Sequence, residues 1–160
     1  MTLTKRLERG FTVVELLTVI AIMMVVTAIA TPSFYYWLPK YRLSAGARQI
    51  AADLHLARMK AISQNTSYRL RFTADDTYEM QKNDGGWAVA PGHGSVKLPE
   101  GITVTIPIVT PFNTSEFQSR GTANTGVGSD EITVTNGDLN KAVCIKLVGR
   151  VHIEESAADC

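Results

Sequence analysis

The stretch Lys5-Arg6-Leu7-Glu8-Arg9-Gly10-Phe11-Thr12-Val13-Val14-Glu15-Leu16-Leu17 begins an apolar run that continues to Ala30. From Phe11 to Ala30 the run contains 20 residues and one charged side chain, Glu15. A helix of about 20 residues is roughly 30 Å long, which is the hydrocarbon thickness of a bilayer. The sequence therefore predicts one membrane-spanning helix near the amino end of the chain.

The charges before this run predict its orientation. Lys5, Arg6 and Arg9 precede it, so we expect the amino end to stay in the cytoplasm and the rest of the chain to cross outward. A secretory signal peptide begins in a similar way, but its apolar region is shorter and ends at a small-residue cleavage site. Because Ala28-Ile29-Ala30 matches such a site only weakly, a signal peptide or a plain anchor fits the run poorly.

Glu15 is the unusual residue of the run. A carboxylate at the centre of a membrane costs about 2.5–3.5 kcal/mol on insertion scales, and less near an end. No Lys or Arg lies three or four residues away from Glu15 within the run. Since charged groups inside membranes are usually paired and functional, we expect the partner of Glu15 to come from another molecule.

The segment from Arg9 to Ile22 resembles the leader of type IV prepilins and of type II secretion pseudopilins. The resemblance implies that a prepilin peptidase cuts after Gly10, keeps the helix and methylates the new amino terminus at Phe11. It also implies that Glu15 attracts the amino terminus of a neighbouring subunit during filament assembly. Both implications are physically sound, because opposite charges attract strongly in a low-dielectric layer and a glycine lets a protease approach the backbone.

The length and charge of the chain limit what lies beyond the leader. The chain has 160 residues and a net charge of +1, and the leader, residues 1–10, has a net charge of +2. The remainder is therefore close to −1, which provides no general attraction for nucleic acid. After the helix, about 95 residues remain, enough for one small domain with one core.

The apolar pattern predicts that the helix continues beyond the membrane segment. Apolar residues recur three or four positions apart between Leu43 and Ala61, which is the spacing of one helical face. We therefore expect one long helix from about Phe11 to Ser63, divided into a membrane or filament-core part at 11–31 and an amphipathic part at 32–63. Pro32 is expected to kink it. The alternative is that the helix ends near Thr31.

The remaining residues, 64–160, predict a β-rich head of seven to nine short strands, sandwich-like in form. Alternating polar and apolar residues and the turn sequence Asn83-Asp84-Gly85-Gly86 support this interpretation. The fold class is therefore α+β. The candidate strands are 68–73, 77–82, 87–90, 96–98, 102–109, 115–119, 132–135, 143–148 and 151–153, with a glycine-rich loop at 119–128.

The head resembles the GspH/FimT group of minor pseudopilins and minor pilins. The resemblance rests on Phe117 followed by Arg120-Gly121, on the strand Ile132 to Asn136, and on Gly149-Arg150-Val151. The helix agrees through Ala52-Asp53-Leu54, Ala57-Arg58 and Ala61-Ile62. The group implies a filament subunit with no enzymatic activity.

The sequence shows no catalytic or metal-binding constellation, and we expect no cofactor and no metal. The three histidines share no metal-ligand spacing with each other or with the cysteines. Asp75, Asp76 and Asp84 lack the spacing of a calcium loop. Cys144 and Cys160 lie in the part expected outside the cytoplasm, where a disulfide could stabilise the head by roughly 3 kcal/mol. Two free thiols remain the alternative, because Cys160 is the final residue.

DNA is considered as a partner because some FimT-like minor pilins bind it, and the resemblance points there to a basic tail after the glycine–arginine pair. Here Arg150 is followed by Glu154, Glu155 and Asp159, which repel phosphate. DNA is therefore unfavoured but not excluded. The basic residues that could still form a patch are Arg69, Arg71, Arg120 and Lys146.

These observations together predict a minor pseudopilin of a type II secretion system. We expect a single-pass protein of the bacterial inner membrane with a periplasmic head, which then enters a pseudopilus or pilus. The expected partners are prepilin peptidase, other pilin or pseudopilin subunits, an inner-membrane assembly platform and secreted cargo. The alternatives are a minor pilin of a type IV pilus and a membrane-anchored β domain without a filament role.

Overall fold

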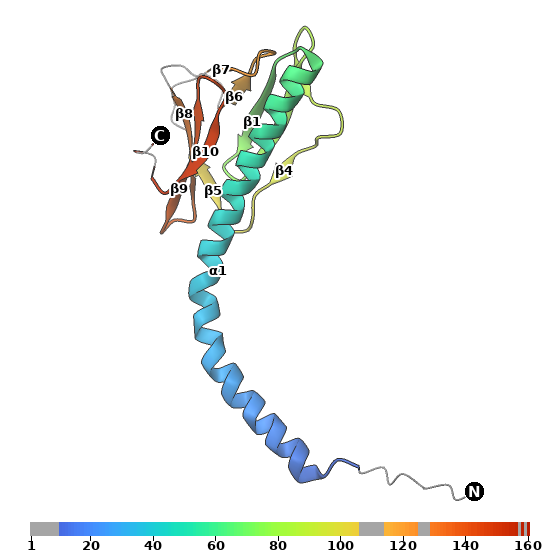
Figure 1. The fold of residues 1–160 in the computed structure, drawn as a ribbon, viewed down its shortest axis with the longest axis vertical. Coiled ribbons are helices and arrows are strands. Elements are labelled where there is room, and N and C mark those ends of the chain that lie inside the picture. The colour runs from blue at the N-terminus through green and yellow to red at the C-terminus, as the bar shows by residue number, and fades with distance from the viewer. Residues whose placement is uncertain (1–9, 106–113, 125–128, 157, 159) are drawn as a thin grey trace, which may run out of the picture. The chain divides into compact units, whose positions relative to one another are not determined.

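The computed structural model describes residues 10–105, 114–124, 129–156, 158 and 160. The chain divides into two compact units, residues 1–38 and 39–160. One helix, α1 (Val13–Gln64), begins in the first unit and ends in the second, and all the strands belong to the second (Figure 1). The head is therefore residues 39–160, which includes the amphipathic part of α1.

Helix α1 is 52 residues long and is helical through both Pro32 and Pro39. This confirms the prediction of one long helix, and the alternative ending near Thr31 is wrong. The kink expected at Pro32 stays a prediction. The helix ends where Asn65 adopts a left-handed backbone with a φ of 51°, and the amide of Thr66 donates to the carbonyl of Ala61 at 3.2 Å. Such a residue is a common terminator of helices.

The strands form two antiparallel sheets. The larger sheet has the order β3-β2-β1-β6-β7, with β4 also paired to β2, and the smaller sheet has the order β10-β9-β8-β5. In the larger sheet the strands are β1 (Tyr68–Ala74), β2 (Thr77–Asn83), β3 (Trp87–Val89), β4 (Val96–Lys97), β6 (Thr114–Phe117) and β7 (Ala123–Asn124). In the smaller sheet they are β5 (Thr103–Thr105), β8 (Ser129–Thr135), β9 (Asn140–Lys146) and β10 (Val151–Glu154).

The described residues thus contain ten strands, against the seven to nine that the sequence predicts. Strand β7 lies inside the predicted glycine-rich loop, so that part of the prediction is wrong. Its two residues extend because β6 pairs with them and because the amide of Ala123 donates to the carbonyl of Leu147. Strands β8 and β9 each begin three residues before their predicted starts. Residues 106–109 of the predicted fifth strand lie outside the described residues.

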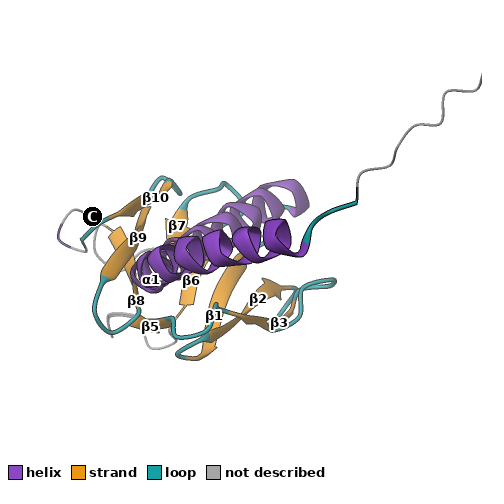
Figure 2. Cartoon of the chain, turned by 90° about the horizontal axis from the view of Figure 1, so that it is seen from below, coloured by secondary structure: helices purple, strands orange, loops and turns teal. Residues whose placement is uncertain are grey.

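Both sheets and α1 contribute to one core within the head. The apolar face predicted for α1 is buried at all six positions: Leu43, Ala47, Ile50, Leu54, Ala57 and Ala61. Tyr68, Leu70 and Phe117 face it from the larger sheet, and Ile132 and Val143 from the smaller one. Within the head, α1 lies alongside strands of both sheets (Figures 1 and 2). The head is sandwich-like in that two sheets share a core, which α1 also lines.

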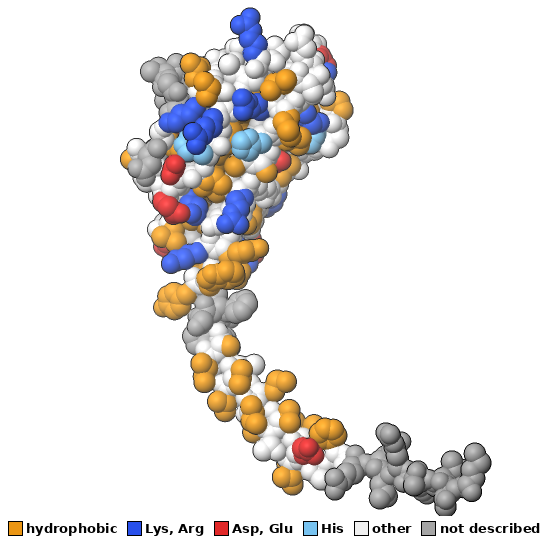
Figure 3. Space-filling model, viewed as in Figure 1, with side chains coloured by type: hydrophobic (Ala, Val, Ile, Leu, Met, Phe, Trp, Pro, Cys, Tyr) orange, Lys and Arg blue, Asp and Glu red, His pale blue; other side chains and the backbone are white. Residues whose placement is uncertain are grey.

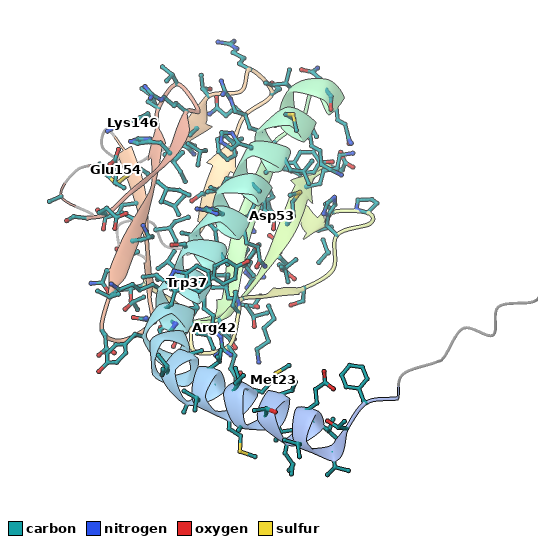
Figure 4. All side chains as sticks on the ribbon, turned by 60° about the horizontal axis from the view of Figure 1, so that its bottom comes forward. Met23, Trp37, Arg42, Asp53, Lys146 and Glu154 are labelled. Atoms are coloured by element: carbon teal, nitrogen blue, oxygen red, sulfur yellow. A yellow bond between two sulfur atoms is a disulfide. The ribbon has the colours of Figure 1, made fainter. Side chains whose placement is uncertain are left out.

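Polar contacts join α1 to the larger sheet and to the loop after β4. The hydroxyl of Tyr78 donates to Oδ2 of Asp53 at 2.6 Å, and Figure 4 labels Asp53 on α1. Nearer the start of the head, Gln49 Nε2 donates to the carbonyl of Lys97 at 3.3 Å. The side chain of Arg42 donates to the carbonyl of Glu100 at 3.4 Å. These contacts fix the rotation of the helix about its own axis.

Candidate functional site

The first turn of α1 begins directly after the predicted cleavage point. Thr12 precedes the helix, and its Oγ1 accepts a hydrogen bond from the amide of Glu15 at 3.2 Å. This is an N-cap, which satisfies an amide that has no partner within the helix. Thr12 and Glu15 have the spacing of a capping box, a signal that could have located the start of the helix from sequence. The cap places Glu15 in the first turn.

Glu15 is exposed, and it forms no ion pair with a described residue. The first turn of a helix carries the positive end of the helix dipole, which favours a carboxylate there. Gly10 and Phe11 immediately precede this turn and are exposed as well. Cleavage between them would leave the new amino group four residues before Glu15. A positive and a negative charge would then lie at the same end of an apolar helix.

The segment after Glu15 is apolar on every side. From Val13 to Ala30 the mean hydropathy is 2.6, and none of this window is buried within the chain. It is long and apolar enough to cross a membrane, as a signal sequence can also be. On the visible face of the first unit, hydrophobic side chains surround a single acidic one (Figure 3). A helix that is apolar all round requires lipid or other protein around it.

The hydroxyl groups in this segment are satisfied by the helix itself. Thr18 Oγ1 donates to the carbonyl of Val14 at 2.5 Å, and Thr27 Oγ1 donates to the carbonyl of Met23 at 2.7 Å. A donor left unpaired in hydrocarbon costs several kcal/mol, and these bonds remove that cost. Among the predicted site residues, only Glu15 therefore presents an uncompensated polar side chain in the apolar segment.

The structure joins Cys144 and Cys160 in a disulfide, with their Cα atoms 5.4 Å apart. Cys144 is buried on β9, opposite His152 of β10. The bridge attaches the end of the chain to the smaller sheet. His152 lies beside it with a buried Nδ1 that has no hydrogen-bond partner among the described atoms. The sequence allows either a disulfide or two free thiols at these cysteines, and the structure has the disulfide.

The glycines of the resemblance meet at one corner of the head. Gly121 and Gly149 belong to the turns after β6 and β9, with φ values of +80° and +77°. The side chain of Arg58 reaches both turns: Nε donates to the carbonyl of Gly121 at 2.9 Å and Nη2 to that of Val148 at 3.1 Å. Arg58 therefore joins α1 to one turn of each sheet by hydrogen bonds. In the sequence, Arg58 stands out only as part of the pattern that resembles the family, and its bonding role is visible only in the structure.

The acidic residues considered for calcium are not gathered into a site. The described residues contain no group of three or more metal-ligating side chains. Asp76 pairs with Lys97 at 3.2 Å, and Asp84 pairs with Lys82 at 2.7 Å. The threonine and lysine contacts of Asp76 hold the pKa of its carboxyl below the usual range. These carboxylates serve as ion-pair partners on the surface.

Comparison with models of known protein families shows which family the chain belongs to. The family model described as type II transport protein GspH matches residues 46–149, well over half of the chain. The chain belongs to the GspH family. A second family model, the prokaryotic N-terminal methylation motif, matches residues 5–31. The GspH family consists of structural pilin-like subunits rather than enzymes, and the methylation motif together with the apolar helix indicates membrane anchoring.

Solved structures of the GspH-like fold include both pilus and secretion proteins. The type IV minor pilin FimU of Pseudomonas aeruginosa is 16% identical, with a TM-score of 0.60 over 74% of this chain and 92% of its own. The minor pseudopilin EpsH of the Vibrio cholerae type 2 secretion system is 14% identical, with a TM-score of 0.57 over 71% and 97%. At these identities the similarity shows the fold. No curated protein matches the chain.

Proposed function

We propose that this GspH-family chain is a minor pseudopilin, a structural subunit of the type II secretion pseudopilus. The observation that carries the proposal is the apolar helix Val13–Ala30, unburied within the chain and followed by a head with a core of its own. Exposing such a surface to water costs roughly 25 cal/mol of free energy per Å² of apolar area. Lipid covers it before assembly, and the helices of other subunits cover it afterwards.

Processing and assembly follow from the first turn of the helix. Prepilin peptidase cuts after Gly10 and methylates Phe11, and the mature protein waits in the inner membrane with its head in the periplasm. The assembly platform then moves it into the filament. Glu15 pairs with the amino terminus of a neighbouring subunit, because a carboxylate without a partner is costly in an apolar layer. The head contacts other minor subunits or secreted cargo.

A minor pilin of a type IV pilus is the second candidate. The observation in its favour is the similarity of the head to FimU, with a TM-score close to that for EpsH. Deleting the gene separates the two functions. Loss of exoprotein secretion with normal pili supports the pseudopilin, whereas loss of pili with normal secretion supports the minor pilin.

The Gly10→Ala variant tests the cleavage site. The added methyl group should block the approach of the peptidase, so uncut precursor should accumulate in the membrane fraction on immunoblots. Gly94→Ala is a suitable control, because a Cβ there meets no atom within 4 Å. Normal processing of the Gly10→Ala precursor would refute the leader assignment.

The Glu15→Ala variant tests the pairing role. We expect normal cleavage but loss of the chain from purified filaments, measured by immunoblotting of sheared material. Thr12→Ala is the matched control, since it removes the helix cap and keeps the carboxylate. If both variants assemble equally poorly, Glu15 acts through the helix start and not through its charge. Normal incorporation of Glu15→Ala would exclude the pairing role.

A further inference from the structure

The corner closed by Arg58 brings together three segments that are far apart in the sequence. They are the last turns of α1, the turn after β6 and the turn after β9. A Cβ added at Gly149 would lie 1.9 Å from the carbonyl oxygen of Gly121, and one added at Gly121 would lie 2.7 Å from Cδ1 of Ile62. Both glycines are buried, so the three segments are in direct contact. Side chains that leave this corner therefore belong to one continuous surface.

This surface is basic. Arg120 precedes Gly121 and Arg150 follows Gly149, and both side chains are exposed. Lys146, labelled in Figure 4, is half-buried and lies across the turn from Arg150, to whose carbonyl its amide donates at 2.9 Å. Among the described residues, Arg58 bonds to two neutral carbonyl groups and to no carboxylate. No ion pair joins these four residues to an acidic side chain that the structure describes.

Exposed aliphatic side chains lie among these cations. Ile62, Leu147 and Val148 are 51%, 56% and 66% exposed, and they extend from two of the three contacting segments, α1 and the turn after β9. Met59 is one helical turn before Ile62 and is 61% exposed. On the upper part of the head, Lys and Arg side chains gather with hydrophobic ones (Figure 3). Apolar side chains with a charged rim are typical of protein interfaces.

Several other cations of the head have acidic partners in the structure. Arg71 pairs with Glu79 at 3.8 Å and Arg42 with Glu100 at 3.6 Å. The acidic residue of β10 is Glu154, four residues beyond Arg150 along the strand and paired with His152. At about 3.3 Å per residue, that is roughly 13 Å away, beyond the Debye length of about 8 Å at physiological salt. The corner therefore lacks acidic neighbours within its own hairpin.

We infer that this surface, formed by Arg58, Arg120, Lys146 and Arg150 around Ile62, Leu147 and Val148, binds an acidic amphipathic segment of a partner protein. The uncompensated cations require carboxylates, and the aliphatic centre requires apolar side chains. A phosphate backbone would satisfy the first requirement and leave the second unmet. The inference goes beyond the proposed function, because it names the chemistry of the partner that the head binds. The whole surface lies within residues 39–160 and includes no residue of the apolar segment Val13–Ala30.

The test uses the full chain in lipid nanodiscs and a fluorescent synthetic peptide of glutamate and leucine at helical spacing. We expect salt-sensitive binding, seen as fluorescence anisotropy, that weakens about tenfold or more in the double variant Arg120→Glu, Arg150→Glu. A peptide with lysine in place of glutamate should not bind, and one with serine in place of leucine should bind more weakly.

Lys60→Glu is the matched control. Lys60 lies two residues after Arg58, about 200° around the helix, and it should not affect binding. Because Arg120 and Arg150 are exposed, the double variant should keep the melting temperature of the native protein, and Arg120→Gln, Arg150→Gln provides a milder second variant. Equal binding by the native protein and both double variants would overturn the inference. Tighter binding of a mixed-sequence DNA duplex than of the acidic peptide would overturn it in favour of a nucleic-acid surface.

Discussion

Gly121 and Gly149 are packed so closely that neither position has room for a side chain. Their left-handed φ values and their contact with one another explain why the pairs Arg120-Gly121 and Gly149-Arg150 stand out in the sequence. The sequence identifies these pairs by resemblance alone, and the structure provides the physical reason. The glycines allow the two turns to come into contact, and hydrogen bonds from Arg58 hold both turns against α1.

Gly149→Ala should destabilise the head by about 3 kcal/mol or more, because it adds backbone strain and a clash with the carbonyl of Gly121. Thermal unfolding monitored by circular dichroism measures the loss. Gly86→Ala is the control, since a Cβ there meets nothing within 4 Å and its φ is not left-handed. Equal melting temperatures for the two variants would contradict this account of the corner.

Tyr78 is a second residue whose role depends on tertiary contacts. Burial raises the pKa of its hydroxyl above the usual 10.0, and the hydrogen bond to Asp53 adds to the effect. The folded head therefore favours the neutral phenol. The stability that this provides is complete below about pH 10 and is lost as the pH rises further.

Tyr78→Phe should cost about 1.5–3 kcal/mol, because it removes a hydrogen bond to a carboxylate. Urea unfolding at about pH 8 and about pH 11 should show a larger alkaline loss of stability for the native protein than for the variant. Tyr36→Phe is the control, since Tyr36 is exposed. The same alkaline loss in native protein and Tyr78→Phe would mean that other groups cause it.

At the scale of elements, α1 contains two kinds of helix in one continuous segment. Its first part is apolar on all sides, and its second part buries one face against two sheets. Periodicity predicts both parts, because helical spacing depends only on local geometry. The strand boundaries are predicted less well. Strand β7 exists because β6 pairs with it, and no local pattern indicates that pairing.

The disulfide attaches Cys160, six residues beyond the last strand, to β9. Cys160→Ser should lower the free energy of unfolding by about 3 kcal/mol, because the bridge closes a loop across a separation of 16 residues. Urea unfolding with and without reductant measures the loss, and reductant should affect the native protein but not the variant. Maleimide labelling of Cys144 in unreduced, denatured native protein would show that the bridge is absent.

At the scale of the whole molecule, the buried core of the described residues lies entirely within 39–160. The apolar segment of the first unit contributes nothing to it. The two units are therefore stabilised in different ways. The head is stable through its own packing, whereas the amino-terminal helix needs lipid or other subunits to cover its surface.

A fragment that begins at Pro39 should remain soluble and unfold cooperatively, because it keeps all the core residues of the described structure. Cell fractionation should recover it without membranes, and circular dichroism should show one thermal transition. Leu54→Ala in the same fragment should cost about 2–5 kcal/mol, since Leu54 is fully buried. Aggregation of the unsubstituted fragment would show that the first unit is needed for folding.

The sequence by itself determined the amino-terminal methylation motif, the long helix with its buried face, and the α+β class. Each of these depends on charge, hydropathy or a period of a few residues, which are local properties. Only the tertiary structure decided that Cys144 meets Cys160, that Arg58 joins two distant turns, and that Arg150 lies on the surface of Arg120 and Lys146. The disulfide and the hydrogen bonds of Arg58 join residues 16 to 90 positions apart, and strand pairing and core packing bring such residues together.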